Sequence, residues 1–241
     1  MSIPADLIRR AELLKNSSLK LFLDYDGTLI PIKMDPDDCY ADSELKDILN
    51  SLDNNYEMYI VTGRSLDDIT KFIGNAYNVI ALHGAVMRIG GEIRENIPDL
   101  AYFTQICDRI FKNRKLFESQ YDGLRMYNKN GNLLFHLGLM TDDRRKDELE
   151  GLVRNMGEEN MMDVYEGKMI MELRVPGINK GSAIHKMRNG SNAIIAGDDR
   201  TDEESFEANG DAVRIKVGIG KTKADFVLSD YREMRQFLKL L

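Results

Sequence analysis

Short apolar runs alternate with stretches of helical periodicity in the first and last thirds of the chain. Residues 19–23, 56–61 and 192–197 are apolar enough to form strands that are buried on both faces. Between the first two runs, residues 43–52 place apolar side chains at helical spacing. Strand and helix alternating at this spacing require right-handed crossovers, and therefore predict an α/β fold with a doubly wound parallel sheet. The same reasoning places helices at 3–15, from 65 onward, 180–188 and 230–241, and strands at 78–82, 212–217 and 225–228.

The middle of the chain has a different pattern. A helix is predicted over 99–118, and Asn130-Gly131 joins two strands at 124–129 and 132–140, because this dipeptide favours a tight hairpin turn. A charged helix over 142–156 and a second hairpin over 161–175 follow. This order predicts an α+β cap domain at 100–177, inserted into an α/β core made of 1–99 and 178–241. Residues 85–94 are predicted to form a hairpin that leads away from the core sheet.

The charge balance narrows the range of partners. The chain has 33 Lys and Arg against 40 Asp and Glu, which gives a net charge of −7. No overall positive field would attract nucleic acid or an anionic membrane, so an anionic substrate needs locally placed cations. No apolar stretch reaches the roughly 18 residues of a membrane span, and no signal peptide is recognisable. We expect a cytoplasmic protein in which Cys39 and Cys107 are reduced thiols.

Three of the predicted strands end in polar side chains. Asp24, Thr62 and Asp198 each follow an apolar run, and a parallel sheet brings such strand ends to one edge. Two carboxylates held close together disfavour mutual ionisation, and Mg²⁺ is the cation that prefers such oxygen ligands. Zinc is not expected, because no His or Cys spacing suits it; the three histidines are His83, His136 and His185.

These side chains suit transfer of a phosphoryl group. Asp24 can attack phosphorus, and Asp26 can protonate the leaving oxygen and later deprotonate water. Thr62 can donate its hydroxyl to the phosphate, and Lys180 can neutralise charge in the transition state.

The spacing of these residues resembles the haloacid dehalogenase superfamily. Asp24-x-Asp26-x-Thr28, Thr62, Lys180 and Gly197-Asp198-Asp199 occur in the order of its four motifs. The resemblance implies a nucleophile at Asp24, an acid/base at Asp26 and phosphate contacts from Thr62 and Lys180. It also implies that Asp199 or Asp202 orients Lys180 or metal-bound water. The implied metal group comprises Asp24, Asp26 (through its main-chain carbonyl), Asp198, Asp199 and Asp202.

Longer strings are similar to one family within that superfamily, the trehalose-6-phosphate phosphatases. The most specific is Gly197-Asp-Asp-Arg-Thr-Asp-Glu203. The resemblance implies Mg²⁺-dependent hydrolysis of trehalose 6-phosphate through an aspartyl-phosphate. Lys168 and Glu172 share one side of a regular strand and would present a donor and an acceptor to sugar hydroxyls. One departure is that His136 precedes Leu137-Gly138, where many family members have an aromatic residue and an arginine. The predicted substrate contacts are Arg64, His83, His136, Lys168 and Glu172.

Other functions remain open at this point. A related phosphatase for sucrose phosphate, mannosyl-3-phosphoglycerate or a hexose phosphate would share the catalytic residues and differ in the cap. A phosphomutase would need to retain a bisphosphate. A silent sugar-phosphate sensor or regulatory subunit would be expected to have lost Asp24 or Asp26, and both are present. The predicted partner is a small sugar phosphate, without nucleic acid or membrane. The synthase domain of fused family members is absent, so we expect a free-standing phosphatase. Association with a trehalose-6-phosphate synthase is a further possibility.

Overall fold

The computed structural model of the 241-residue chain describes all residues except 1–2, 16–17, 34 and 168. The chain folds into two compact units. The core unit consists of Met1–Asn96 and Asn179–Leu241, and the inserted unit of Ile97–Ile178. Each is described by itself below.

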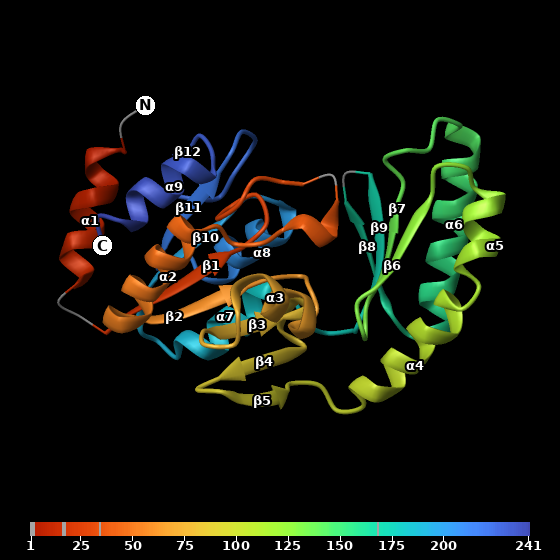
Figure 1. Cartoon of the computed structure of the whole chain (residues 1–241), viewed down its shortest axis with the longest axis horizontal. Helices are drawn as coiled ribbons and strands as arrows, with labels where there is room; N and C mark the ends of the chain where they lie inside the picture. Colours follow the sequence, from red (N-terminus) through yellow and green to blue (C-terminus); the bar gives the residue numbers. More distant parts are fainter. Residues whose placement is uncertain (1–2, 16–17, 34, 168) are drawn as a thin grey trace. The chain divides into compact units, whose positions relative to one another are not determined.

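The core unit is built on a mixed sheet with β1 (Leu19–Asp24) near its centre (Figure 1). β1 pairs in parallel with β2 (Glu57–Val61) on one side and with β10 (Asn192–Gly197) on the other. The predicted α/β class with a parallel central sheet is therefore confirmed. Eight strands of the described chain make up this sheet, in the order β12 (Phe226–Leu228), β11 (Val213–Val217), β10, β1, β2, β3 (Asn78–Ala81), β4 (Val86–Ile89) and β5 (Glu92–Glu95).

The hairpin predicted to lead away from this sheet instead extends it. β4 pairs antiparallel with β3, and β5 pairs antiparallel with β4. The chain reverses after β3 through a short 3₁₀ turn, Leu82–Gly84, in which Leu82 and His83 have φ values of 48° and 57°. This left-handed backbone folds β4 back beside β3.

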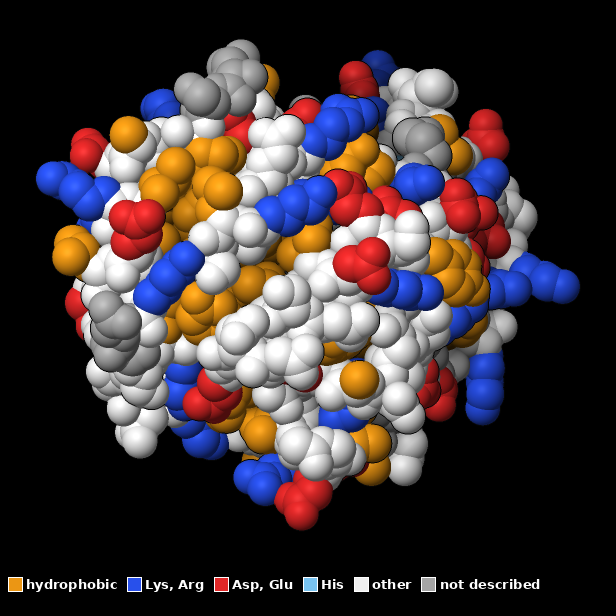
Figure 2. Space-filling model, turned by 60° about the vertical axis from the view of Figure 1, so that its left-hand side comes forward, with side chains coloured by type: hydrophobic (Ala, Val, Ile, Leu, Met, Phe, Trp, Pro, Cys, Tyr) orange, Lys and Arg blue, Asp and Glu red, His pale blue; other side chains and the backbone are white. Residues whose placement is uncertain are grey.

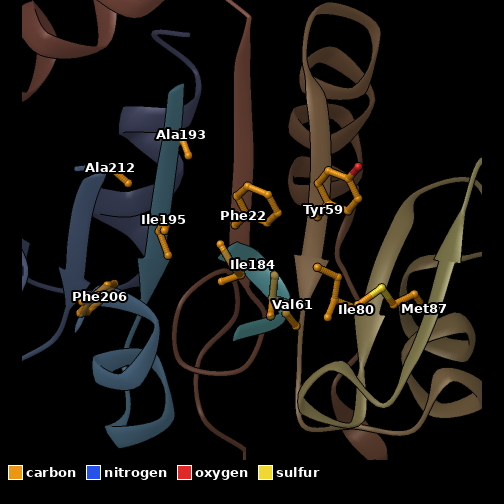
Figure 3. Close-up of a cluster of buried hydrophobic side chains, with 11 residues drawn as sticks. Phe22, Tyr59, Val61, Ile80, Met87, Ile184, Ala193, Ile195, Phe206 and Ala212 are labelled. Atoms are coloured by element: carbon orange, nitrogen blue, oxygen red, sulfur yellow. The ribbon is translucent and has the colours of Figure 1, made fainter. Parts of the chain in front are cut away.

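One face of the core sheet packs against α7 (Lys180–Arg188) and α8 (Arg200–Ala208). Phe22 and Tyr59 stack there with ring centroids 5.0 Å apart, in a cluster of buried side chains that also includes Ile184 from α7 and Phe206 from α8 (Figure 3). Alternate residues of a strand share a face, so Asp24 continues the row of Phe22 on this side. The strand thus directs its terminal carboxylate toward the face that carries α7 and α8.

Side-chain caps fix where several of the core helices begin. Asp42, Ser65, Asn179, Asp199 and Asp230 each accept a hydrogen bond from a main-chain N–H in the first turn, which satisfies donors left free at a helix start. α8 is not predicted by the sequence pattern. The remaining helices of this unit are α1 (Ala5–Lys15), α2 (Ser43–Asn55), α3 (Leu66–Ile73), α9 (Tyr231–Leu238) and the 3₁₀ turn Pro36–Asp38.

The inserted unit has an antiparallel sheet with its helices along one face, and its strands lie in the order β6 (Arg125–Asn128), β7 (Leu133–His136), β9 (Ile170–Arg174) and β8 (Asp163–Gly167) (Figure 1). The prediction of a single helix over 99–118 is wrong. The segment forms two helices separated at Lys112–Asn113, where the side-chain amide of Asn113 donates to the carbonyl of Arg109. The helices of this unit are α4 (Leu100–Phe111), α5 (Arg114–Gln120) and α6 (Asp143–Asn160).

Charges of both signs lie close together on the face of the molecule seen in Figure 2, interspersed with hydrophobic side chains. Neither sign dominates this face. In the described part of the chain, no helix has the length and apolar character needed to cross a membrane.

Candidate active site

A lysine joins two carboxylates at the carboxyl edge of the core sheet. Lys180, the first residue of α7, donates from Nζ to Asp24 Oδ1 (2.6 Å) and to Asp202 Oδ1 (2.9 Å). All three side chains are buried. The Asn179 cap fixes the start of α7, because its side chain accepts from the N–H of Ser182 at 2.8 Å. β1, α7 and α8 therefore place this cluster together.

Asp198, which follows β10, brings a third carboxylate to Asp24. Ligand atoms of Asp24, Asp198 and Asp202 lie within 4.8 Å of one another. Gly27 makes room for this approach, since a Cβ at that position would lie 2.1 Å from Asp198 Oδ2. Its φ of 82° is a second reason for glycine there.

The electrostatics of the cluster follow from its crowding. Burial raises the pKa of Asp24 to about 7, although the charge of Lys180 opposes this, and Asp198 adds to the rise. Desolvation, together with the charges of Asp202 and Asp199, raises the pKa of Asp198 to about 7. Burial opposes the charge of Lys180, but Asp202 and Asp24 outweigh it and hold its pKa well above the ordinary value. The buried site thus favours the neutral, protonated forms of Asp24 and Asp198.

A pH dependence of stability follows. The folded pKa of Asp198 lies above its ordinary 3.8, so the folded state binds the proton more tightly than the unfolded state. Relative to an Asp198→Asn variant, the metal-free protein should lose free energy of unfolding as the pH rises from about 4 to about 7. Urea unfolding in EDTA across this range measures the difference. A difference that stays constant with pH would contradict the shift.

The donor set fits Mg²⁺. It consists of carboxylate oxygens, which this hard cation prefers. Asp24 Oδ2 is buried and has no hydrogen-bond partner among the described residues. A divalent cation would satisfy this oxygen and stabilise the charged forms of the two carboxyl groups, which burial and the neighbouring acids disfavour.

Asp199 and Asp202, which the sequence left undistinguished, have different surroundings. Asp202 Oδ2 accepts from the main-chain N–H groups of Asp198 (3.0 Å) and Asp199 (3.1 Å), while its Oδ1 accepts from Lys180. Asp199 caps α8, and its Oδ1 accepts from the N–H and hydroxyl of Thr201. Of the two, Asp202 is therefore the residue whose carboxylate accepts a hydrogen bond from Lys180.

Asp26 and Arg64 form a bidentate ion pair at the same edge. Arg64 Nε and Nη2 donate to the two Asp26 carboxylate oxygens at 2.6 and 2.8 Å, and Nη1 donates to the carbonyl of Pro36 at 2.9 Å. Thr62 follows Val61, the register partner of Asp24, and its Oγ1 accepts from the N–H of Arg64 at 3.1 Å. Arg64 thus contacts both Asp26 and Thr62.

His83 is buried at the turn after β3. Its main-chain N–H donates to the carbonyl of Thr62 at 3.0 Å. Its ring packs on Gly63, where a Cβ would lie 2.6 Å from the ring atoms. These contacts connect His83 to the loop that carries Thr62.

Among the predicted sugar contacts of the inserted unit, Glu172 lies in β9. This side chain is 1% exposed, and it accepts from Lys129 Nζ at Oε1 and from Arg174 Nε at Oε2, both at 2.7 Å. His136 ends β7, and Lys168 lies outside the described residues.

Sequence reasoning missed three buried or half-buried cations beside these acids: Lys129, Arg174 and Lys216. A signal existed for Lys216, because a lysine interrupts the apolar positions of a buried strand, residues 213–217.

The family model and the curated relatives that match this chain point to the same family. The trehalose-phosphatase family model matches residues 22–230. A trehalose-6-phosphate phosphatase-related protein of Thermoplasma acidophilum is 47% identical over 224 residues, which is 92% of this chain and 96% of the relative.

Solved structures agree with this similarity. The crystal structure of a trehalose-6-phosphate phosphatase related protein has a TM-score of 0.86 and 47% identity, covering 91% of this chain and 95% of that one. A haloacid dehalogenase-like hydrolase from B. subtilis shares the fold, with a TM-score of 0.59 at 15% identity over 91% of this chain and 98% of that one. This similarity shows that the chain shares the fold of a haloacid dehalogenase-like hydrolase. The chain belongs to the trehalose-phosphatase family, whose members are phosphoric monoester hydrolases.

Proposed function

We propose that this protein hydrolyses trehalose 6-phosphate to trehalose and phosphate, with Mg²⁺ as cofactor. The observation that carries the proposal is the hydrogen-bonded ion pair of Lys180 with Asp24, beside Asp198 at the edge of the core sheet. The chain that contains this ion pair belongs to the trehalose-phosphatase family. Asp24 is thus a buried carboxylate with one oxygen, Oδ2, that has no hydrogen-bond partner among the described residues, and its other oxygen contacts the ammonium group of Lys180.

In the proposed reaction, Asp24 is the nucleophile. Its carboxylate forms a bond to phosphorus while the bond from phosphorus to the sugar oxygen breaks. Asp26 gives a proton to that leaving oxygen, and then takes one from the water that attacks the aspartyl-phosphate. Phosphate leaves, and both carboxyl groups return to their starting states.

The neighbouring residues position the reacting groups and neutralise the charge that develops on the phosphoryl group. Lys180 stays charged and compensates the negative charge that grows on the phosphoryl oxygens. The N–H of Arg64 occupies an acceptor site of the Thr62 hydroxyl, which leaves the proton of this hydroxyl for a phosphate oxygen. Arg64 holds the Asp26 carboxylate by two hydrogen bonds.

Asp24, Asp198 and Asp202 would hold Mg²⁺, with the carbonyl of Asp26 as a further ligand. When bound, the cation would supply charge neutralisation to the carboxylates and to the phosphate. The roles predicted for Asp199, His83 and His136 stay predictions, as do those of the two domains and the association with a synthase.

We further propose that Glu172 contributes to sugar binding by positioning Lys129 and Arg174 as donors to sugar hydroxyls. A Glu172→Gln variant should lose about 10- to 100-fold in kcat/KM for trehalose 6-phosphate, mainly through KM, because a hydrogen bond to a charged group contributes about 1.5–3 kcal/mol. Hydrolysis of p-nitrophenyl phosphate, which has no sugar, should stay unchanged. Steady-state kinetics with both esters measure this.

The matched control is Glu166→Gln on the adjacent strand. Glu166 pairs with Arg154 at 2.6 Å and is half-exposed, so neither substrate should be affected. Equal losses for both esters in Glu172→Gln would indicate a purely structural residue.

The function itself is tested by phosphate release from a panel of sugar phosphates in Mg²⁺ and in EDTA. We expect selective release from trehalose 6-phosphate, and none in EDTA. Broad release would move the substrate to another sugar phosphate, and no release from any ester would refute the proposal.

A further inference from the structure

Lys216 in β11 is a buried cation whose role is not yet accounted for. Its Cα is the register partner of Gly197, the last residue of β10, and the residue is 5% exposed. Burying an ammonium group is costly unless it is paired and hydrogen-bonded. The contacts of this side chain therefore indicate what it does.

The ammonium group of Lys216 holds the residue that follows β10. Its Nζ donates a hydrogen bond to the main-chain carbonyl of Asp198. Glu203 Oε1, from α8, lies 3.7 Å from the same nitrogen and balances its charge. Lys216 thus contacts the backbone of Asp198 and leaves the carboxylate open.

Asp198 is also fixed at two other points. Its N–H donates to Asp202 Oδ2 at 3.0 Å, and its carboxylate lies against Gly27, at the position where a Cβ would be 2.1 Å away. With Lys216 on the carbonyl, both polar main-chain groups of Asp198 are held. The direction of the carboxylate then follows from the backbone.

We propose that Lys216 is a positioning residue, which holds the Asp198 main chain so that this carboxylate is directed toward Asp24 for binding a divalent cation. This inference rests on the proposed function, because there Asp198 is a metal ligand. Replacing a residue that hydrogen-bonds to a metal ligand without touching the metal typically lowers metal affinity by roughly 10- to 100-fold.

A purely electrostatic role predicts the opposite sign. A positive charge beside a cation site repels the cation, so removing it should tighten Mg²⁺ binding. Loss of a positioning contact should weaken binding. The sign of the change therefore separates the two roles.

The test is isothermal titration of Mg²⁺ into EDTA-treated, dialysed protein. For Lys216→Met we expect binding weaker by about 10- to 100-fold than in the wild type. Unchanged or tighter binding would overturn the proposal. If Lys216→Met lacks a cooperative thermal transition, Lys216→Gln replaces it with the same expected loss.

Arg88→Met is the matched control for general destabilisation. Arg88 is also a buried cation, 5% exposed, and it donates to the carbonyls of Tyr77 and Gly74 beside β4. Its replacement should leave Mg²⁺ affinity within about twofold of the wild type. An equal loss in both variants would overturn the positioning role. Absence of Mg²⁺ binding in the wild type would instead refute the proposed function.

Discussion

Replacing Asp24 by asparagine should reduce phosphate release from trehalose 6-phosphate by about 10⁵-fold or more, the scale seen when a covalent nucleophile is removed. The neutral amide cannot form the acyl-phosphate that the proposed route requires. Folding should survive, because burial disfavours a charge at this position and Lys180 keeps Asp202 as a partner. Steady-state phosphate release, with thermal unfolding measured in parallel, tests this.

The control is Asp6→Asn in α1. The Asp6 side chain is largely exposed and pairs with Arg9 at 3.2 Å, so its replacement should leave the rate and stability nearly unchanged. A folded Asp24→Asn variant that retained a tenth of the wild-type rate would exclude Asp24 as the nucleophile.

Lys180→Met should lower kcat by about 10³-fold or more, on the scale of cations that stabilise phosphoryl transfer. It should also destabilise the metal-free protein by about 3–5 kcal/mol, because Asp24 and Asp202 lose their buried partner. Mg²⁺ should recover part of this loss, since it neutralises the same carboxylates. Urea unfolding with and without Mg²⁺, beside kcat, measures both effects.

Lys186→Met on the same helix is the matched control. Lys186 is exposed and donates to Asn96 Oδ1 at 2.8 Å, so little change is expected in either quantity. If Lys180→Met kept kcat within tenfold of the wild type, Lys180 would not compensate charge in the transition state.

The central strands could be predicted because their apolar runs are local and continuous. α8 could not, because its segment Arg-Thr-Asp-Glu-Glu-Ser-Phe-Glu-Ala has no apolar stripe. Its buried face consists of Thr201, Asp202, Ser205 and Phe206, which form a helix through capping and tertiary contacts. The pairing of β4 with β3 depends on the left-handed turn at His83, which no periodicity signals.

In the site, the proximity of Asp24 and Asp198 could be predicted, because each follows an apolar run and parallel strands bring their carboxyl ends to one edge of the sheet. The different hydrogen-bond partners of Asp199 and Asp202 could not be predicted, because both residues belong to one capping box and have the same side chain. The pairing of Arg64 with Asp26, and of Lys129 and Arg174 with Glu172, depends on side-chain geometry between distant segments.

The most direct test of the account is to trap the covalent intermediate. Protein mixed with trehalose 6-phosphate and Mg²⁺ is quenched in acid and reduced with borohydride, which converts an aspartyl-phosphate to homoserine. Mass spectrometry of the digested protein should then find homoserine at position 24, and should find none in EDTA or with trehalose alone. Phosphate release without homoserine at this position, or with homoserine at another aspartate, would contradict the account.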